Sequence, residues 1–212
     1  MCVDDGEELA EESLRSVRDQ GVDELVVVPG PRTRLSVVEK YADVVTEPVS
    51  PVGYARYVGL LRASNRIVAF CDTDTVYGEK YLEHAVEDFS ENPGLAVVKA
   101  GVVLPHEPSP LGYAESLVMY FVGAWEFGWV VDRDKLLRAL GSDDVELLKR
   151  PRVDFGMLPS VRRLKSLVDR RMVIKTRLPT YFFKNYSPAV IGASVPVAAV
   201  SLLAILGGRG VR

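Results

Sequence analysis

The stretch from Arg66 to Asp74 constrains the fold of this chain more than any other. Residues 67–71 form an unbroken apolar run, and two aspartates, Asp72 and Asp74, follow it directly. An apolar run between polar residues predicts a strand buried on both faces, as in a parallel sheet. Ligands of open α/β folds bind beyond the carboxyl ends of such strands, so the aspartates are candidate ligands for Mg²⁺ or Mn²⁺ holding a diphosphate. The alternative is a surface turn, because Asp and Thr also favour turns.

Helical and strand patterns alternate along the chain. Helices are predicted at residues 6–19, 35–41, 51–61, 78–89, 132–140 and 154–168, and strands at 25–28, 44–45, 67–71, 95–103 and, as an edge strand, 172–177. This order predicts an α/β fold, a three-layer sandwich with a mainly parallel sheet and helices on both faces. Residues 1–186 then form one domain, and no second soluble domain is required.

Composition excludes several classes of protein. The chain has 212 residues, 48% of them hydrophobic, and a formal net charge of −3. Nothing in this balance indicates a nucleic-acid partner. Cys2 and Cys71 are the only cysteines and there are two histidines, so neither a disulfide framework nor a structural zinc site is expected. Residues 4–20 are too charged for a signal peptide.

The C-terminal part of the chain has a different character. Residues 188–208 carry no charge, and Ser194 and Ser201 are their only polar side chains. As a helix this segment would be about 31 Å long, enough to cross a bilayer. We therefore predict a transmembrane helix at residues 187–208, with a buried core helix or a tail on a partner as alternatives. The basic residues before it favour a membrane-anchored protein whose main domain is cytoplasmic.

The stretch from Gly53 to Asp74 resembles the centre of the family 2 glycosyltransferases. In those enzymes an Ala-Arg-Asn-x-Gly helix leads into a strand that ends in an Asp-x-Asp motif. Arg56 and Gly59 keep that spacing, while Tyr57 replaces the usual Asn. The resemblance implies the GT-A fold, in which Asp72 and Asp74 hold Mg²⁺ or Mn²⁺ and Arg56 contacts the donor phosphate.

A second stretch, from Gly128 to Asp144, is similar to the acceptor-side segment of the same family. A catalytic Glu-Asp pair normally follows it by about ten residues, at the start of a helix. Asp154 fits the second position of that pair, with Val153 in place of the Glu. A rival alignment places the pair at Asp143 and Asp144. The resemblance thus implies Asp154, or else Asp144, as the general base that removes a proton from the acceptor hydroxyl.

Two departures from the family pattern concern donor binding. Family members begin with a strand that leads to the nucleotide base, whereas Met1-Cys2-Val3 is too short for it, so we expect the sheet to lack its first strand or the start site to be misplaced. The usual Asp-Asp-Gly-Ser after the second strand is replaced by residues 28–31, Val-Pro-Gly-Pro.

Together, these features predict an inverting, metal-dependent glycosyltransferase. Its expected partners are a nucleotide-sugar donor, a lipid-linked or other glycan acceptor, and the membrane through residues 187–208. Two alternatives stay open. One is a nucleotidyltransferase of related fold, because residues 30–35 of this chain partly resemble the Gly-rich loop of that group. The other is a degenerate, non-catalytic relative associated with the membrane.

Overall fold

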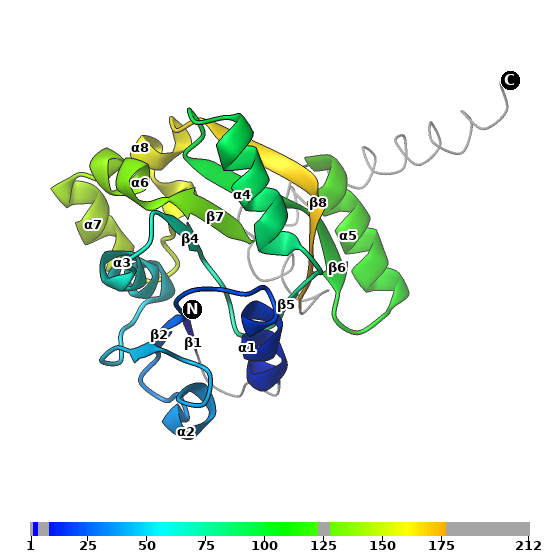
Figure 1. Cartoon of the computed structure of the whole chain (residues 1–212), viewed down its shortest axis with the longest axis horizontal. Helices are drawn as coiled ribbons and strands as arrows, with labels where there is room; N and C mark the ends of the chain where they lie inside the picture. Colours follow the sequence, from blue (N-terminus) through cyan, green and yellow to red (C-terminus); the bar gives the residue numbers. More distant parts are fainter. Residues whose placement is uncertain (1, 4–8, 123–127, 177–212) are drawn as a thin grey trace, which may run out of the picture.

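The computed structural model describes residues 2–3, 9–122 and 128–176, whose strands form two sheets (Figure 1). The smaller sheet is parallel and has the order β1-β2-β3. Its strands are β1 (Cys2–Val3), β2 (Val26–Pro29) and β3 (Val44–Val45). The expectation that the first strand is missing is therefore wrong in part, because Cys2 pairs with Val28 and Val3 with Pro29.

The larger sheet has the order β4-β7-β6-β8-β5 and is mixed. Its strands are β4 (Ile67–Ala69), β5 (Thr75–Tyr77), β6 (Val97–Pro105), β7 (Trp129–Asp132) and β8 (Ser166–Thr176). Only β6 and β8 pair in parallel. The prediction of a mainly parallel sheet is thus wrong. The pairs β4–β7, β6–β7 and β5–β8 are antiparallel, so the alternation of helices and strands along the chain does not by itself determine strand direction.

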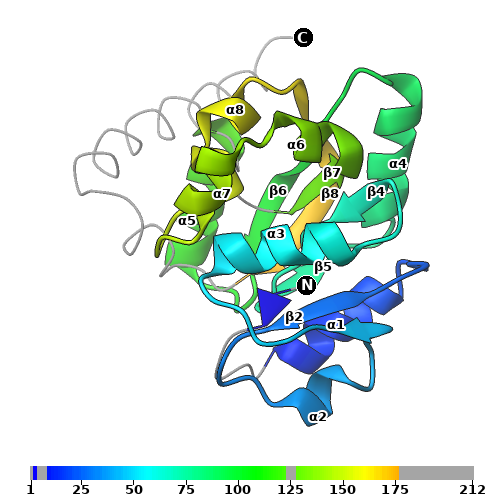
Figure 2. The same ribbon diagram turned by 90° about the vertical axis from the view of Figure 1, so that its left-hand side faces the viewer.

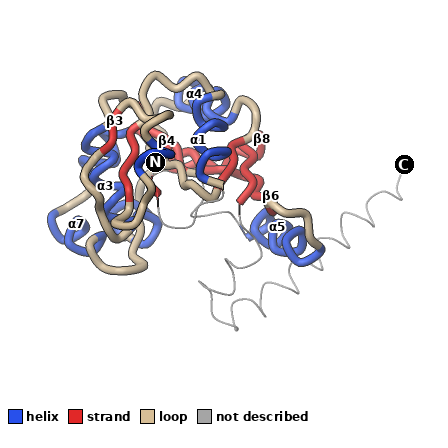
Figure 3. Tube along the Cα trace, turned by 90° about the horizontal axis from the view of Figure 1, so that it is seen from below, coloured by secondary structure: helices blue, strands red, loops and turns tan. Residues whose placement is uncertain are grey.

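Helices pack on both faces of the larger sheet, which gives the predicted three layers (Figures 2 and 3). Val98 and Val130 lie in one core with side chains of α1 (Ala10–Arg18) and α4 (Tyr81–Glu91). Val97 and Val131 lie in another core with side chains of α3, α6, α7 and α8. The remaining helices are α2 (Leu35–Val38), α3 (Val52–Arg62), α5 (Pro110–Val122), α6 (Arg133–Ala139), α7 (Ser142–Leu148) and α8 (Pro159–Arg162). Neighbouring residues such as Val97 and Val98, or Val130 and Val131, therefore face opposite layers, as expected in a pleated strand.

The last described part of the chain departs most from the prediction. The helix expected at 154–168 is replaced by a 3₁₀ turn (Phe155–Met157) and by the four-residue α8. Pro159 starts α8, since a proline suits the first turn of a helix and not its interior. The strand expected at 172–177 begins at Ser166 instead and lies inside the sheet, between β6 and β5.

The apolar run at residues 67–71 is also less buried than expected. All three residues of β4 are half-buried, and β4 is the last strand of its sheet on one side. Phe70 and Cys71 are buried, but they follow the strand. The prediction of a strand covered on both faces in a parallel sheet is therefore wrong.

The predicted transmembrane segment, residues 187–208, lies outside the described residues. Among the residues that the structure does describe, no helix is long and apolar enough to span a bilayer.

Candidate active site

Asp72 and Asp74 lie on the turn that joins β4 to β5. Helix α1 holds this turn through the fully buried Ser13. The Ser13 Oγ donates hydrogen bonds to the carbonyl oxygens of Asp72, at 2.8 Å, and Thr75, at 2.5 Å. The backbone N–H of Asp72 donates to the hydroxyl of Tyr77 at 2.9 Å. Burial raises the pKa of Tyr77, so this phenol stays neutral and can accept that bond. These bonds fix the turn, in which Asp72 is half-buried and Asp74 is exposed.

Arg56 of α3 joins two carboxylates that are far apart in the sequence. Its Nη2 lies 2.6 Å and 2.8 Å from the two oxygens of Asp72, and its Nη1 donates to Oδ2 of Asp154. The side chains are 13% exposed for Arg56, 25% for Asp72 and 20% for Asp154. The cation is thus the most buried member of the cluster, and the carboxylates reach toward solvent. The sequence predicted neither ion pair: it assigned Arg56 to a donor phosphate, Asp72 to the cation and Asp154 to the acceptor hydroxyl, and these roles stay predictions.

Gly53 explains how α3 brings Arg56 to this place. A Cβ at Gly53 would lie only 2.2 Å from the carbonyl oxygen of Val153, so no other residue allows this approach. The close contact sets the first turn of α3 directly against the residue before Asp154. Arg56 follows one turn later on the helix, within reach of Asp154.

Asp154 is held by its own turn as well as by Arg56. Its Oδ1 accepts a hydrogen bond from the backbone N–H of Phe155 at 2.7 Å, at the start of the 3₁₀ turn. The buried Phe155 ring packs against Phe70, with 5.2 Å between the ring centres. Because Phe70 lies two residues before Asp72, this contact brings the two carboxylate segments together. A small cavity of about 10 Å³, the size of one water, lies between them.

The rival base Asp144 has a different role. Its Oδ2 accepts from the backbone N–H of Gly141 at 3.0 Å, which caps the start of α7. It is not among the residues that line the cavity beside Asp72 and Asp154. The structure therefore brings Asp154, and not Asp144, to Arg56.

Asp74 is the exposed end of the motif. Its carbonyl oxygen accepts from Thr176 Oγ1 and its Oδ1 from Thr75 Oγ1, each at 3.2 Å. Sequence reasoning missed the contributions of Ser13, Phe155 and Gly53. Ser13 gives no sequence signal, because a serine inside an amphipathic helix is common. Gly53 was a usable signal, because a glycine inside a helix lowers helix stability. Such a glycine indicates a position where another segment lies too close for a side chain.

The sequence matches no family model and none of the curated proteins. Solved structures do match. Glucosyl-3-phosphoglycerate synthase from Mycobacterium tuberculosis in complex with phosphoglyceric acid gives a TM-score of 0.57 at 18% sequence identity, covering 96% of this chain and 77% of that chain. The chain has the GT-A glycosyltransferase fold.

A second solved structure with this fold comes from another organism. A mannosyltransferase from Pyrobaculum calidifontis, in complex with GDP-Man and Mn²⁺, gives a TM-score of 0.55 at 18% identity, covering 100% of this chain and 75% of that chain. The mycobacterial synthase has also been solved with Mn²⁺, UDP-glucose and phosphoglyceric acid, with a TM-score of 0.57. The fold implied by the sequence resemblance is thus confirmed.

Proposed function

We propose that the chain is a glycosyltransferase that moves a sugar from a nucleotide-diphospho-sugar to an acceptor hydroxyl, with inversion at the anomeric carbon. The observation that carries the proposal is the cluster of Arg56, Asp72 and Asp154 where β4 ends. Three segments of the chain meet there, and Asp154 is 98 residues from Arg56. The fold supports it, because matched structures of this fold are named as sugar transferases or synthases and hold UDP-glucose or GDP-Man with Mn²⁺.

The carboxylates of the turn suit a hard divalent cation. Among the described residues, no three His, Cys, Asp or Glu side chains gather into a ligand set. Asp72 and Asp74 would therefore supply two ligands to Mg²⁺ or Mn²⁺, and the donor diphosphate and water the others. When bound, the cation neutralises charge on the leaving nucleoside diphosphate.

Arg56 has two tasks in this proposal. It holds Asp72 and Asp154 on opposite sides of one guanidinium, which fixes the distance between the donor side and the acceptor side. To contact a donor phosphate as well, its guanidinium would donate to a phosphate oxygen in place of one carboxylate, since it can donate to both kinds of oxygen in the same geometry. Donor binding would then loosen one of the two ion pairs.

Asp154 is the proposed general base. It begins the 3₁₀ turn, whereas Asp72 follows β4, so the two carboxylates reach the site from different segments. An acceptor hydroxyl between them can give its proton to Asp154 while its oxygen attacks the anomeric carbon, and the nucleoside diphosphate leaves on the other side. The backbone bond from Phe155 keeps Oδ1 fixed, so Oδ2 is the atom that takes the proton once Arg56 shifts.

The test compares Asp154→Asn with Asp144→Asn. Hydrolysis or transfer of radiolabelled UDP-glucose and GDP-mannose is measured with Mn²⁺ present. Asp154→Asn is expected to lower the rate about 10²- to 10⁴-fold, because general bases contribute that much. Asp144→Asn should stay within about twofold, since Asp144 caps a surface helix. Equal rates in wild type and Asp154→Asn, with both folded by circular dichroism, would contradict the proposed base.

We also propose that residues 187–208 attach the enzyme to a membrane, with the catalytic domain on the cytoplasmic side and a lipid-linked or cell-envelope glycan as acceptor. The support is the charge-free sequence from Pro188 to Gly208. The full chain should float with phosphatidylglycerol vesicles on a density gradient, and a chain ending at Tyr186 should not. A full chain that stays at the bottom of the gradient would refute the attachment.

A further inference from the structure

The part of the chain that follows α7 carries an excess of positive charge. Residues 149–165, which we call the basic segment, contain a single carboxylate, that of Asp154, whereas the whole chain has a formal net charge of −3. The basic side chains of the segment are all exposed, and they are Lys149, Arg150, Arg152, Arg162, Arg163 and Lys165. The proposed general base is therefore surrounded in the sequence by cations.

Packing explains why these basic side chains are exposed. Phe155, Leu158 and Val161 are buried in the core that also contains side chains of α3 and α6, and Val153 and Leu164 are partly buried there. The segment thus covers one face of the larger sheet with its apolar side chains and leaves its charged ones to solvent. Such a surface attracts anions, but exposed cations alone do not define a binding site.

Arg162 is the one cation of the basic segment whose side chain bonds to a residue of the candidate active site. Its Nε donates to the carbonyl oxygen of Gly156 at 2.8 Å. Gly156 and Asp154 both line the small cavity beside Asp72. This bond uses one of the five N–H donors of the guanidinium, and Arg162 makes no ion pair with the described residues. Its two Nη groups therefore stay available to a ligand next to Asp154.

Arg162 also differs from Arg56, the arginine that lines this cavity. Arg56 is 13% exposed, and the carboxylates of Asp72 and Asp154 balance its charge. Arg162 is exposed, and a neutral carbonyl group holds it, so its positive charge is not balanced. An anionic group that comes to the Asp154 side of the site would therefore be attracted to Arg162.

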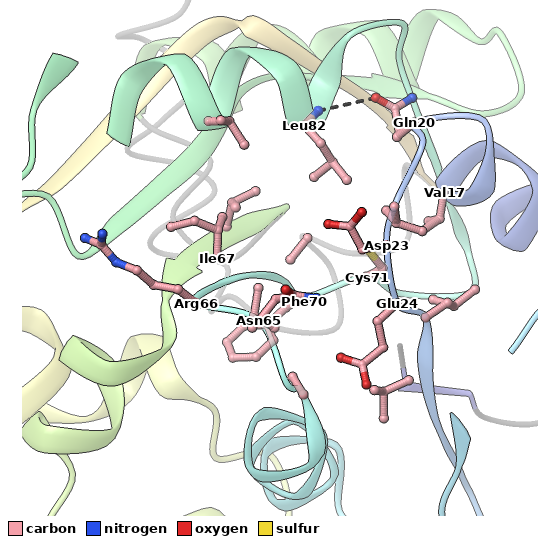
Figure 4. Close-up of a pocket in the computed structure, with 18 of the residues that line it drawn as sticks. Val17, Gln20, Asp23, Glu24, Asn65, Arg66, Ile67, Phe70, Cys71 and Leu82 are labelled. Atoms are coloured by element: carbon pink, nitrogen blue, oxygen red, sulfur yellow. Dashed lines mark hydrogen bonds between the residues drawn. The ribbon is translucent and has the colours of Figure 1, made fainter. Parts of the chain in front are cut away.

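A larger cavity, of about 990 Å³, lies between the two sheets and has the opposite charge (Figure 4). The charged residues that line it are the acidic Asp23, Glu24, Glu83, Glu87 and Glu91 and the basic Arg56 and Arg66. Because carboxylates outnumber cations there, this cavity repels anions. An anionic group is thus favoured beside Arg162 over the cavity between the sheets.

We propose that the acceptor carries an anionic group, a phosphate or a carboxylate, and that Arg162 binds this group beside the hydroxyl that Asp154 deprotonates. The inference rests on the proposed function, because it assigns a class of acceptor to that site. A guanidinium can donate two parallel hydrogen bonds to either anion, so Arg162 selects the charge and shape that the two share. A neutral acceptor would gain nothing from it.

The test measures the calorimetric binding of glucose 6-phosphate, glucuronate and glucose to the full chain, at about 0.15 M salt to screen distant charges. Wild type should bind at least one of the two anions about tenfold or more tightly than glucose. Arg162→Gln should lose this preference. Arg163→Gln removes the same charge at the next exposed residue and should keep the preference within about twofold. Both variants should keep the circular dichroism spectrum of the wild type.

Three results would overturn the proposal: equal binding of all three sugars, no measurable binding of either anion, or the same loss in both variants. The last would mean that the basic segment attracts anions without a specific site. Tighter binding of glucose 6-phosphate assigns the group to a phosphorylated acceptor, and tighter binding of glucuronate to an acidic glycan. The titrations need neither donor nor Mn²⁺. A chain that keeps the preference but transfers no sugar would therefore contradict the proposed function and not the anion site.

Discussion

Two clusters in this molecule join one arginine to two or three carboxylates, but opposite charges are buried in them. In the candidate active site the arginine is inside. Arg56 is 13% exposed, while Asp72 and Asp154 are 25% and 20% exposed. The carboxylates can therefore meet a cation or a substrate without leaving the fold.

The second cluster joins α4 to β8 and has the reverse arrangement. Arg171 is 47% exposed and contacts the exposed Glu87 at 2.8 Å. It also contacts Asp88 at 2.8 Å and Asp169 at 2.9 Å, whose side chains are 7% and 8% exposed. Burial, together with the adjacent Asp169 carboxylate, raises the pKa of Asp88 to about 6, and Arg171 offsets this only in part.

The comparison shows that composition alone does not identify a reactive site. In the candidate active site the carboxylates are more exposed than their cation, whereas in the second cluster two buried carboxylates lie behind an exposed cation, and the raised pKa of Asp88 lowers stability at neutral pH. We therefore assign chemistry to the first cluster and a structural role to the second.

Arg56→Met should have the largest effect on stability. It leaves Asp72 and Asp154 partly buried without their common cation, which we expect to cost about 3 kcal/mol. Urea denaturation measures the loss. The control is Arg15→Met on the surface of α1, where the exposed pair with Glu11 should contribute little. A loss no larger than in the control would mean that the Arg56 cluster does not hold α3 to the Asp154 segment.

Asp88→Asn should have a smaller effect, of opposite sign, at neutral pH. Since the folded-state pKa of Asp88 is raised, the native state binds the proton more tightly than the unfolded state, and wild-type stability should fall as pH rises from about 4 to about 6. Asp88→Asn should remove most of this slope and raise stability at pH 7.5 by about 2 kcal/mol. Urea midpoints across this pH range check it, and an unchanged slope would refute the assignment. Sugar transfer should not change.

Much of the fold follows from local patterns in the sequence. The helix from Val52 to Arg62 and the strands at 26–29 and 97–105 are marked by apolar periodicity and by Pro51. The direction of strand pairing is not local. β7 runs antiparallel to both of its neighbours, β4 and β6. The residues of β7 do not indicate this direction, because it depends on how the connecting segments pass around the core.

The candidate site was predictable as a set of residues but not as a geometry. The spacing of Asp72 and Asp74 after an apolar run, with Asp154 downstream, indicated a donor and an acceptor side. The joint ion pair of Arg56 depends on the contact of Gly53 with Val153, which brings together residues about a hundred positions apart. The half-buried state of β4 follows from its place at the edge of its sheet, which the strand's own sequence does not determine.

The most direct test of the central claim is calorimetric titration of the full chain with UDP and with GDP, with and without Mn²⁺. We expect one of the two nucleotides to bind only when Mn²⁺ is present. Asp74→Asn should weaken that binding at least about tenfold, which is 1.4 kcal/mol, because one of the proposed cation ligands is lost. Asp144→Asn should bind as wild type does. The absence of Mn²⁺-dependent binding, or equal binding by Asp74→Asn, would contradict the assignment of this turn as the metal–diphosphate site.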